Sequence, residues 1–217
     1  MKIRLAIVED QPLFRDLLRN ALGAYGHIEV VSTSGDGRDA IRAAAELRPD
    51  AIVMDIDLGG GMTGIEAAQK IKEARPEVGI VLLSSHRDKE YLQAVAEGRG
   101  GGWSYLLKTT LQQMSTLVRA IEGSTWGLVT LDSTIVERLQ PRAGSSLDQL
   151  TERQMLVLKH VAGGCPDDEI AARADIDEGS VDNEIARICD ELGVGEGDPN
   201  TLRARVAVRL LQETSSR

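Results

Sequence analysis

The chain has 217 residues, 42% of them hydrophobic and 27% charged, with a formal net charge of -9 at pH 7. This composition is ordinary for a globular protein and allows one large domain or two small ones. No apolar run approaches the roughly 18 residues of a membrane span, and the N-terminus reads as a strand rather than a signal peptide. We expect a cytoplasmic protein with reduced thiols and without a zinc or haem site, because its cysteines and histidines are scattered.

The charge is unevenly distributed along the chain. Residues 148–217 hold 8 Lys and Arg against 15 Asp and Glu, so this third of the chain carries -7 of the net charge. Taken alone, that composition argues against nucleic acid as the partner of this region.

The first 123 residues alternate short apolar strands with amphipathic helices. Strands are predicted at residues 3–9, 28–34, 51–57, 79–85 and 104–108, and helices at 12–26, 37–49, 65–76, 88–98 and 109–123. Five β-α units in this order predict an α/β domain with a five-stranded parallel sheet, covered on both faces by right-handed crossovers.

The rest of the chain has a different pattern. Residues 124–147 are less regular and contain Pro141, Gly144 and Ser145, which predicts a linker. Helices are predicted at 151–162, 167–173, 179–192 and 200–213, a set typical of a helix-turn-helix module. We therefore expect three segments: a domain at 1–123, a linker at 124–147 and a small all-α domain at 148–217.

Acidic residues gather at the carboxyl ends of the predicted strands. Glu9 and Asp10 follow the first strand, and Asp55 lies on the third. Three acids at one sheet edge repel one another unless a cation lies among them, and Mg²⁺ suits a site of carboxylate oxygens. Ser84 and Lys108, at the ends of the fourth and fifth strands, add a hydroxyl and an ammonium group to the same edge.

These residues resemble the receiver domain of two-component response regulators, which has a flavodoxin-like, doubly wound fold. The resemblance rests on "VED", "VMDID", "LLSS" and "YLLK", which stand in this order on the correct strands. It implies that Asp55 is the phosphoacceptor, that Lys108 pairs with the phosphoryl oxygens and that Ser84 hydrogen-bonds one of them. Tyr105 resembles the aromatic residue that changes rotamer together with Ser84.

The same resemblance implies a metal site and a signalling role. Glu9, Asp10, Asp55 and the backbone carbonyl of Asp57 are the expected ligands of Mg²⁺. A sensor histidine kinase is the expected partner, and the chain is expected to be a phosphoacceptor rather than an enzyme. A metal-dependent phosphohydrolase would need substrate-binding insertions that this compact segment lacks. The loops at 58–63 and 98–104 depart from the family pattern in length and glycine content.

The C-terminal segment resembles the LuxR-type helix-turn-helix of the NarL/FixJ regulators. The matching features are "LTERQ", "EIA", the V-x-N pattern at 181–183 and the closing "LGV". The resemblance implies DNA as the ligand and residues 179–192 as the recognition helix. Ser180, Asn183 and Arg187 are its candidate DNA contacts.

The acidity of this segment leaves two output functions open. Residues 165–198 hold twelve acids and two bases, although Lys and Arg supply most phosphate contacts in DNA complexes. One function is a DNA-binding transcription factor with weakened DNA affinity; the other is a protein-interaction effector. In the last helix, Arg203, Arg205 and Arg209 stand beside an apolar stripe, so this helix forms a homodimer contact or pairs its arginines with the acidic helices.

Overall fold

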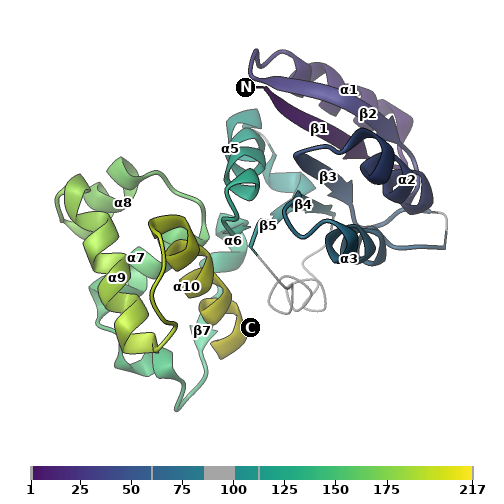
Figure 1. Ribbon diagram of the computed structural model, residues 1–217. Helices are drawn as coiled ribbons and strands as arrows, with labels where there is room; N and C mark the ends of the chain where they lie inside the picture. Colours follow the sequence, from purple (N-terminus) through teal and green to yellow (C-terminus); the bar gives the residue numbers. More distant parts are fainter. Residues whose placement is uncertain (1, 60, 86–100, 112, 217) are drawn as a thin grey trace.

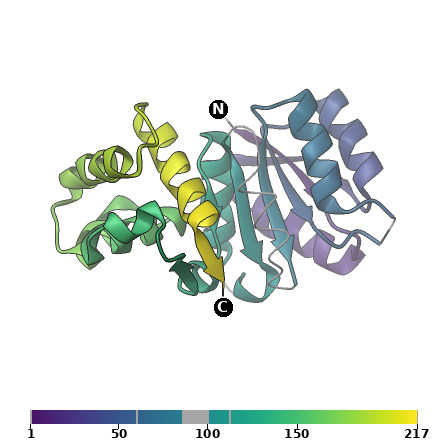
Figure 2. The same cartoon turned by 90° about the horizontal axis from the view of Figure 1, so that it is seen from below.

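The structure is a computed structural model that describes residues 2–59, 61–85, 101–111 and 113–216. An α/β part is followed by a helical part, which lies beside one edge of the sheet (Figures 1 and 2). Both predicted folds are therefore confirmed. No helix in the described ranges is long and apolar enough to cross a bilayer.

The α/β part is built on a parallel sheet with the spatial order β2-β1-β3-β4-β5-β6. The strands are β1 (Ile3–Val8), β2 (Ile28–Ser34), β3 (Ala51–Asp55), β4 (Gly79–Ser84), β5 (Trp103–Leu107) and β6 (Thr130–Leu131). Every residue of β3, β4 and β5 is buried, as expected where both faces of a sheet are covered. The first five strands match the sequence prediction.

Helices cover both faces of this sheet. They are α1 (Pro12–Gly23), α2 (Gly37–Leu47), α3 (Gly64–Ala74) and α5 (Met114–Thr125). Side chains alternate along a strand, so Leu5 and Ile7 share a core with α1 and α5, whereas Ala6 and Val8 share one with α2 and α3. The helix predicted at 88–98 lies outside the described residues.

The start of α3 is fixed against the end of β3. The Thr63 hydroxyl accepts a hydrogen bond from the Glu66 amide, and the Glu66 carboxylate accepts one from the Thr63 amide, which forms a capping box. The Gly64 amide then donates to the Ile56 carbonyl at 2.9 Å. A Cβ atom on Gly64 would lie 1.9 Å from the Asp55 carbonyl oxygen, so only glycine permits this approach.

The segment predicted as a linker is folded into both parts of the chain. It contains β6, a short helix α6 (Ser133–Val136), β7 (Leu139–Pro141) and a 3-10 turn η2 (Ser146–Gln149). The strand β6 extends the sheet next to β5, and β7 pairs antiparallel with β8 (Thr214–Ser216) near the C-terminus. A two-residue strand has too few positions to show an alternating pattern, which is why the sequence did not indicate the sixth strand.

The C-terminal part is a small bundle of helices. They are α7 (Glu152–Ala162), α8 (Asp167–Ala174), α9 (Val181–Leu192) and α10 (Pro199–Glu213), with a 3-10 turn η3 (Glu178–Ser180) before α9. Val157, Ile170, Ile185 and Leu210 are buried and belong to one shared core. The α8-turn-α9 unit has the order of a helix-turn-helix, and α9 corresponds to the predicted recognition helix.

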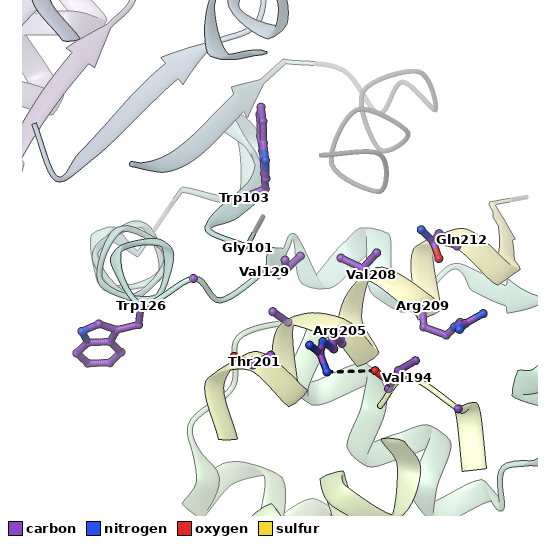
Figure 3. A pocket seen from close by; sticks show the side chains of 13 residues that line it. Gly101, Trp103, Trp126, Val129, Val194, Thr201, Arg205, Val208, Arg209 and Gln212 are labelled. Carbon is purple, nitrogen blue, oxygen red and sulfur yellow. Dashed lines mark hydrogen bonds between the residues drawn. The ribbon is translucent and has the colours of Figure 1, made fainter. Parts of the chain in front are cut away.

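The two parts of the chain meet in two ways. At the turn between α7 and α8, a Cβ atom on Gly164 would lie 2.7 Å from Thr130 Cγ2, so this turn sits directly on β6. Further along the interface, an open pocket of about 620 Å³ separates the end of α5 from α10. Figure 3 shows Trp126 on one side of this pocket and Arg205 and Val208 on the other. Close contact is therefore made through β6, while α10 faces the sheet domain across a gap.

Gly64→Ala is expected to destabilise the chain by about 3 kcal/mol or more, because its methyl group has to displace the β3 backbone. The measurement is urea unfolding of the full chain followed by circular dichroism. Gly23→Ala is the matched control, since a Cβ there meets no atom within 4 Å and alanine favours the helix. Equal unfolding midpoints for the two variants would contradict the tight contact at Gly64.

Candidate functional site

Three acids meet at the carboxyl edge of the sheet, as the sequence predicted. Glu9 and Asp10 follow β1 and Asp55 ends β3, and each offers a carboxylate oxygen within 4.8 Å of the others. Glu9 is 0% exposed and Asp55 is 2% exposed. The neighbouring parallel strands β1 and β3 bring these carboxylates together, because their carboxyl ends lie at the same edge.

Lys108 supplies a cation to this acidic cluster. It follows β5, and its ammonium nitrogen lies 2.8 Å from Glu9 Oε2 and 2.9 Å from Asp55 Oδ2. The same nitrogen lies 5.1 Å from the centre of the Phe14 ring, which the sequence analysis did not single out. One lysine therefore bridges two buried carboxylates that come from different strands.

Burial and the ion pairs act in opposite directions on the protonation of this cluster. Burial raises the pKa of Glu9 and of Asp55, and the hydrogen bonds from Lys108 offset only part of that rise. For Lys108 itself, burial lowers the pKa, but the hydrogen bonds to the two carboxylates outweigh it and the net pKa is raised. The lysine therefore stays protonated near neutral pH, whereas a further cation would stabilise the ionised form of the acids.

The oxygen donors of the cluster are suited to Mg²⁺. Asp10 Oδ1 is buried and accepts no hydrogen bond from the described part of the chain, which leaves an oxygen lone pair for a metal. Backbone amides orient the other acids: Gln11 N donates to Glu9 Oε1 at 3.2 Å, and Asp57 N lies 3.4 Å from Asp55 Oδ1. The backbone of Asp57 is therefore close to the cluster, while its side chain is exposed.

Ser84 and Tyr105 lie on the neighbouring strands. Ser84 ends β4, is fully buried and stands in register with Leu107, the residue before Lys108. Tyr105 lies within β5, is fully buried and stands in register with Leu82 on one side and Leu131 on the other. The structure therefore brings Ser84 to the edge that carries the acids and holds Tyr105 inside the core.

The sequence analysis missed Asp132, which contacts this edge from outside the first 123 residues. Its carboxylate accepts a hydrogen bond from the Leu107 amide at 3.1 Å. The run "LDST" indicates an N-cap, and Asp132 does cap α6, but no sequence pattern pointed to a contact with the residue before Lys108.

The candidate DNA contacts lie at the start and in the middle of α9. Ser180 is the N-cap residue, Asn183 is exposed, and the side chain of Arg187 is 69% exposed. Arg187 also pairs with Glu184 Oε2 at 3.1 Å. The helix is turned away from the sheet domain in both views of the chain (Figures 1 and 2).

Internal ion pairs take up part of the acidity of α9. Arg203 on α10 lies 2.7 Å from Asp182 Oδ1 and binds both oxygens of Asp167 at 2.8 and 2.9 Å. The Glu184 side chain is only 7% exposed and lies between Arg187 and Arg153. For Arg203, the prediction that the α10 arginines pair with the acidic helices is therefore confirmed.

Together these features define a receiver-type α/β domain followed by a helix-turn-helix domain, and comparisons with known proteins agree. Residues 5–122 match the response regulator receiver domain family. The uncharacterized transcriptional regulatory protein YxjL of Bacillus subtilis (strain 168) is 34% identical over 197 residues, 86% of this chain and 88% of that protein. The response regulator protein VraR of Staphylococcus epidermidis is 32% identical over 198 residues, 89% of this chain and 92% of that protein.

Structural similarity supports the same family. A LuxR-family two-component response regulator from Aurantimonas sp. SI85-9A1 superposes with a TM-score of 0.52 at 28% identity, over 58% of this chain and 87% of that chain. The chain therefore belongs to the response regulators, and within them to the LuxR (NarL/FixJ) type. Both resemblances seen in the sequence are confirmed.

Mg²⁺ is expected to raise the thermal unfolding midpoint near neutral pH and to lose this effect in acid. Because burial raises the pKa of Glu9 and Asp55, the apo site is most stable when they are protonated and loses stability as pH rises through their folded pKa values. Mg²⁺ offsets that loss only once the protons have left. The measurement is thermal unfolding across a pH series, with Mg²⁺ and with a chelator.

Asp10→Asn should weaken Mg²⁺ binding about tenfold, which removes about 1.4 kcal/mol of stabilisation at saturating Mg²⁺. Asp57→Asn is the control, because the expected ligand at this position is the backbone carbonyl. A Mg²⁺ effect that grows in acid, or that Asp10→Asn leaves intact, would contradict the assignment.

Proposed function

We propose that this chain is a cytoplasmic response regulator that accepts a phosphoryl group on Asp55 and controls transcription through its helix-turn-helix domain. The observation that carries the first half is the bridge from Lys108 to Asp55 and Glu9, at 2.9 and 2.8 Å. An ion pair that serves only the structure needs one carboxylate for the lysine, but here Lys108 contacts two. A third carboxylate, that of Asp10, lies nearby and has a buried oxygen that accepts no hydrogen bond from the described residues.

The chemistry follows from these positions. A carboxylate oxygen of Asp55 attacks the phosphorus of the donor, a new P–O bond forms, and the bond to the leaving group breaks with its electron pair. Glu9, Asp10, Asp55 and the Asp57 carbonyl would hold Mg²⁺, which would supply positive charge for the phosphoryl oxygens. Lys108 is already charged and lies beside the nucleophile, so it needs only a small movement to reach a phosphoryl oxygen.

Ser84 gives the domain a means to respond. It ends β4, at the edge where β5 leads into Lys108, and we expect its hydroxyl to hydrogen-bond an oxygen of the phosphoryl group on Asp55. Tyr105 is fully buried on β5, and the family resemblance implies that it changes rotamer when Ser84 moves toward that group. A sensor histidine kinase is the proposed physiological donor.

Asp55→Ala is expected to abolish labelling by acetyl phosphate or phosphoramidate in the presence of Mg²⁺, because the nucleophile is lost. Phosphate-affinity electrophoresis or mass spectrometry of the intact chain measures the labelling. Asp57→Asn is the matched control, a neighbouring acid that should still allow labelling. Labelled Asp55→Ala would sink the phosphoacceptor assignment.

For the output, the placement of α9 supports DNA binding. The helix projects away from the sheet domain (Figures 1 and 2), and of its candidate DNA contacts Asn183 and Arg187 are exposed and Ser180 is half-buried. Pairing of Asp182 with Arg203 lowers the acidity that the sequence suggested for this surface. The YxjL relative, which aligns well beyond the receiver region, is a transcriptional regulatory protein by name.

Most of the apolar stripe of α10 is not available for a homodimer contact. Val206, Leu210 and Leu211 are at most 9% exposed, because they pack inside the chain's own core. Two exposed residues of α10, Arg205 and Gln212, line the pocket that faces the sheet domain.

The second candidate function is a protein-interaction effector, and the remaining charge of α9 favours it. Asp190 and Glu191 are exposed at the end of the helix, where phosphate contacts would need bases. Glu191 accepts a hydrogen bond from Gln154 Nε2 at 2.8 Å, and Asp190 adds a second exposed acid beside it. Selection of bound genomic fragments at low and at physiological salt separates the two functions, since a transcription factor enriches specific sequences.

Asp190→Lys is expected to tighten binding to a short random-sequence duplex about fivefold at low salt, and to steepen the salt dependence by about one unit in the log–log slope. Fluorescence anisotropy measures both. Glu46→Lys changes the net charge equally but lies on α2, an exposed position of the sheet domain, and serves as the control. Equal effects of the two variants would show that α9 does not face the duplex.

A further inference from the structure

Asp132 stands out among the buried polar residues because it lies outside the receiver region yet reaches the receiver's functional edge. It follows β6 and precedes α6, ten residues beyond the matched segment 5–122. Its exposed fraction is 2%. A buried carboxylate needs hydrogen-bond donors, so its contacts show what it holds in place.

The two carboxylate oxygens of Asp132 accept hydrogen bonds from different elements. Oδ1 accepts from the Thr134 amide at 3.0 Å and from the Thr134 hydroxyl at 2.6 Å, as an ordinary N-cap does. Oδ2 accepts from the Leu107 amide at 3.1 Å and from the Thr110 hydroxyl. Capping α6 requires only the first oxygen, so the second pair of contacts calls for another explanation.

The two contacts of Oδ2 are made to residues on either side of Lys108 in the sequence. Leu107 precedes it, and Thr110 ends the 3-10 turn η1 (Lys108–Thr110) that follows β5. The Thr110 hydroxyl oxygen also lies 2.8 Å from the Leu107 carbonyl oxygen, so its single hydrogen is shared between this carbonyl and the Asp132 carboxylate. Asp132 therefore holds both ends of the three-residue turn from which the lysine side chain extends to Glu9 and Asp55.

The backbone of Asp132 is anchored to the same strand. Its amide donates to the Tyr105 carbonyl at 2.8 Å, and β6 runs parallel to β5 with Leu131 opposite Tyr105. Thr130, in the same strand β6, packs against Gly164 in the turn between α7 and α8 of the output domain. By contrast, α10 faces the receiver across the open pocket in Figure 3.

We propose that Asp132 is a positioning residue for the phosphorylation site: its carboxylate sets the turn that aims Lys108 at Asp55. The proposal rests on the phosphoacceptor function of Asp55. If so, the rate of phosphorylation depends on the segment that leads to the output domain, because Asp132 can contact the turn only while β6 stays paired with β5.

The test compares initial rates of labelling by phosphoramidate with Mg²⁺ in the full chain. Asp132→Asn keeps one acceptor oxygen but presents an amide group to the Leu107 N–H or to Thr134, and should lower the rate about tenfold, as a misplaced positioning group does. Asp198→Asn is the matched control. Asp198 is also an aspartate N-cap, accepting from Asn200 and Thr201 on α10, far along the chain from the turn.

A double-mutant cycle separates positioning from general damage. In a Lys108→Ala background, Asp132→Asn should change the remaining rate less than twofold, roughly the error of the cycle, because the group that it positions is gone. A similar loss in both backgrounds would overturn the proposal and indicate a structural role. A wild-type rate for Asp132→Asn would overturn it as well.

Thr110 provides an independent variant should Asp132→Asn fail to fold. Thr110→Val removes the hydroxyl that binds Asp132 and should lower the rate, whereas Thr110→Ser keeps that hydroxyl and should restore it. Equal rates for the valine and serine variants would reject the proposal. An unlabelled wild-type chain would instead refute the phosphoacceptor function itself, so the two failures are distinguishable.

Discussion

The structure of the receiver depends on how two buried carboxylates share one lysine. Glu9 and Asp55 are almost fully buried, and neither could stay ionised there without a cation within hydrogen-bond distance. The ammonium of Lys108 provides it because β1, β3 and β5 are parallel and end at the same edge of the sheet. Any cation or phosphoryl group that enters the site has to redistribute this charge, so binding and conformational change are linked by electrostatics.

In the output domain, too, one basic side chain pairs with two acids from different elements. Arg203 extends from α10 to acids on α8 and α9, so one guanidinium group joins three helices. Its bidentate contact with Asp167 uses the planar fork that lysine lacks. Asp167 and Asp182, two of the acids of this domain, therefore also hold its helices together, which makes them difficult to replace one at a time.

Much of the fold and of the candidate site was predictable because its signals are local. Buried parallel strands appear as short apolar runs, and the acids and Lys108 follow those runs directly. The contacts of Asp132 and Arg203 were not predictable, since they depend on how distant elements pack. Lys72 is a further example: it reads as a surface base, yet it is 6% exposed, donates to the carbonyls of Pro76 and Gly101, and has its pKa lowered by burial to about 8.

The short strand β6 also bears on how the molecule avoids unwanted association. Without it, β5 would be the last strand of the sheet, with five buried, mainly apolar residues and a row of unpaired amides and carbonyls. An edge of that kind is a template for strand addition by another chain. Two residues of β6 cover part of it, and the helix-turn-helix domain then covers β6 at Gly164. The segment that connects the two domains thus also covers part of a sheet edge to which another chain could add a strand.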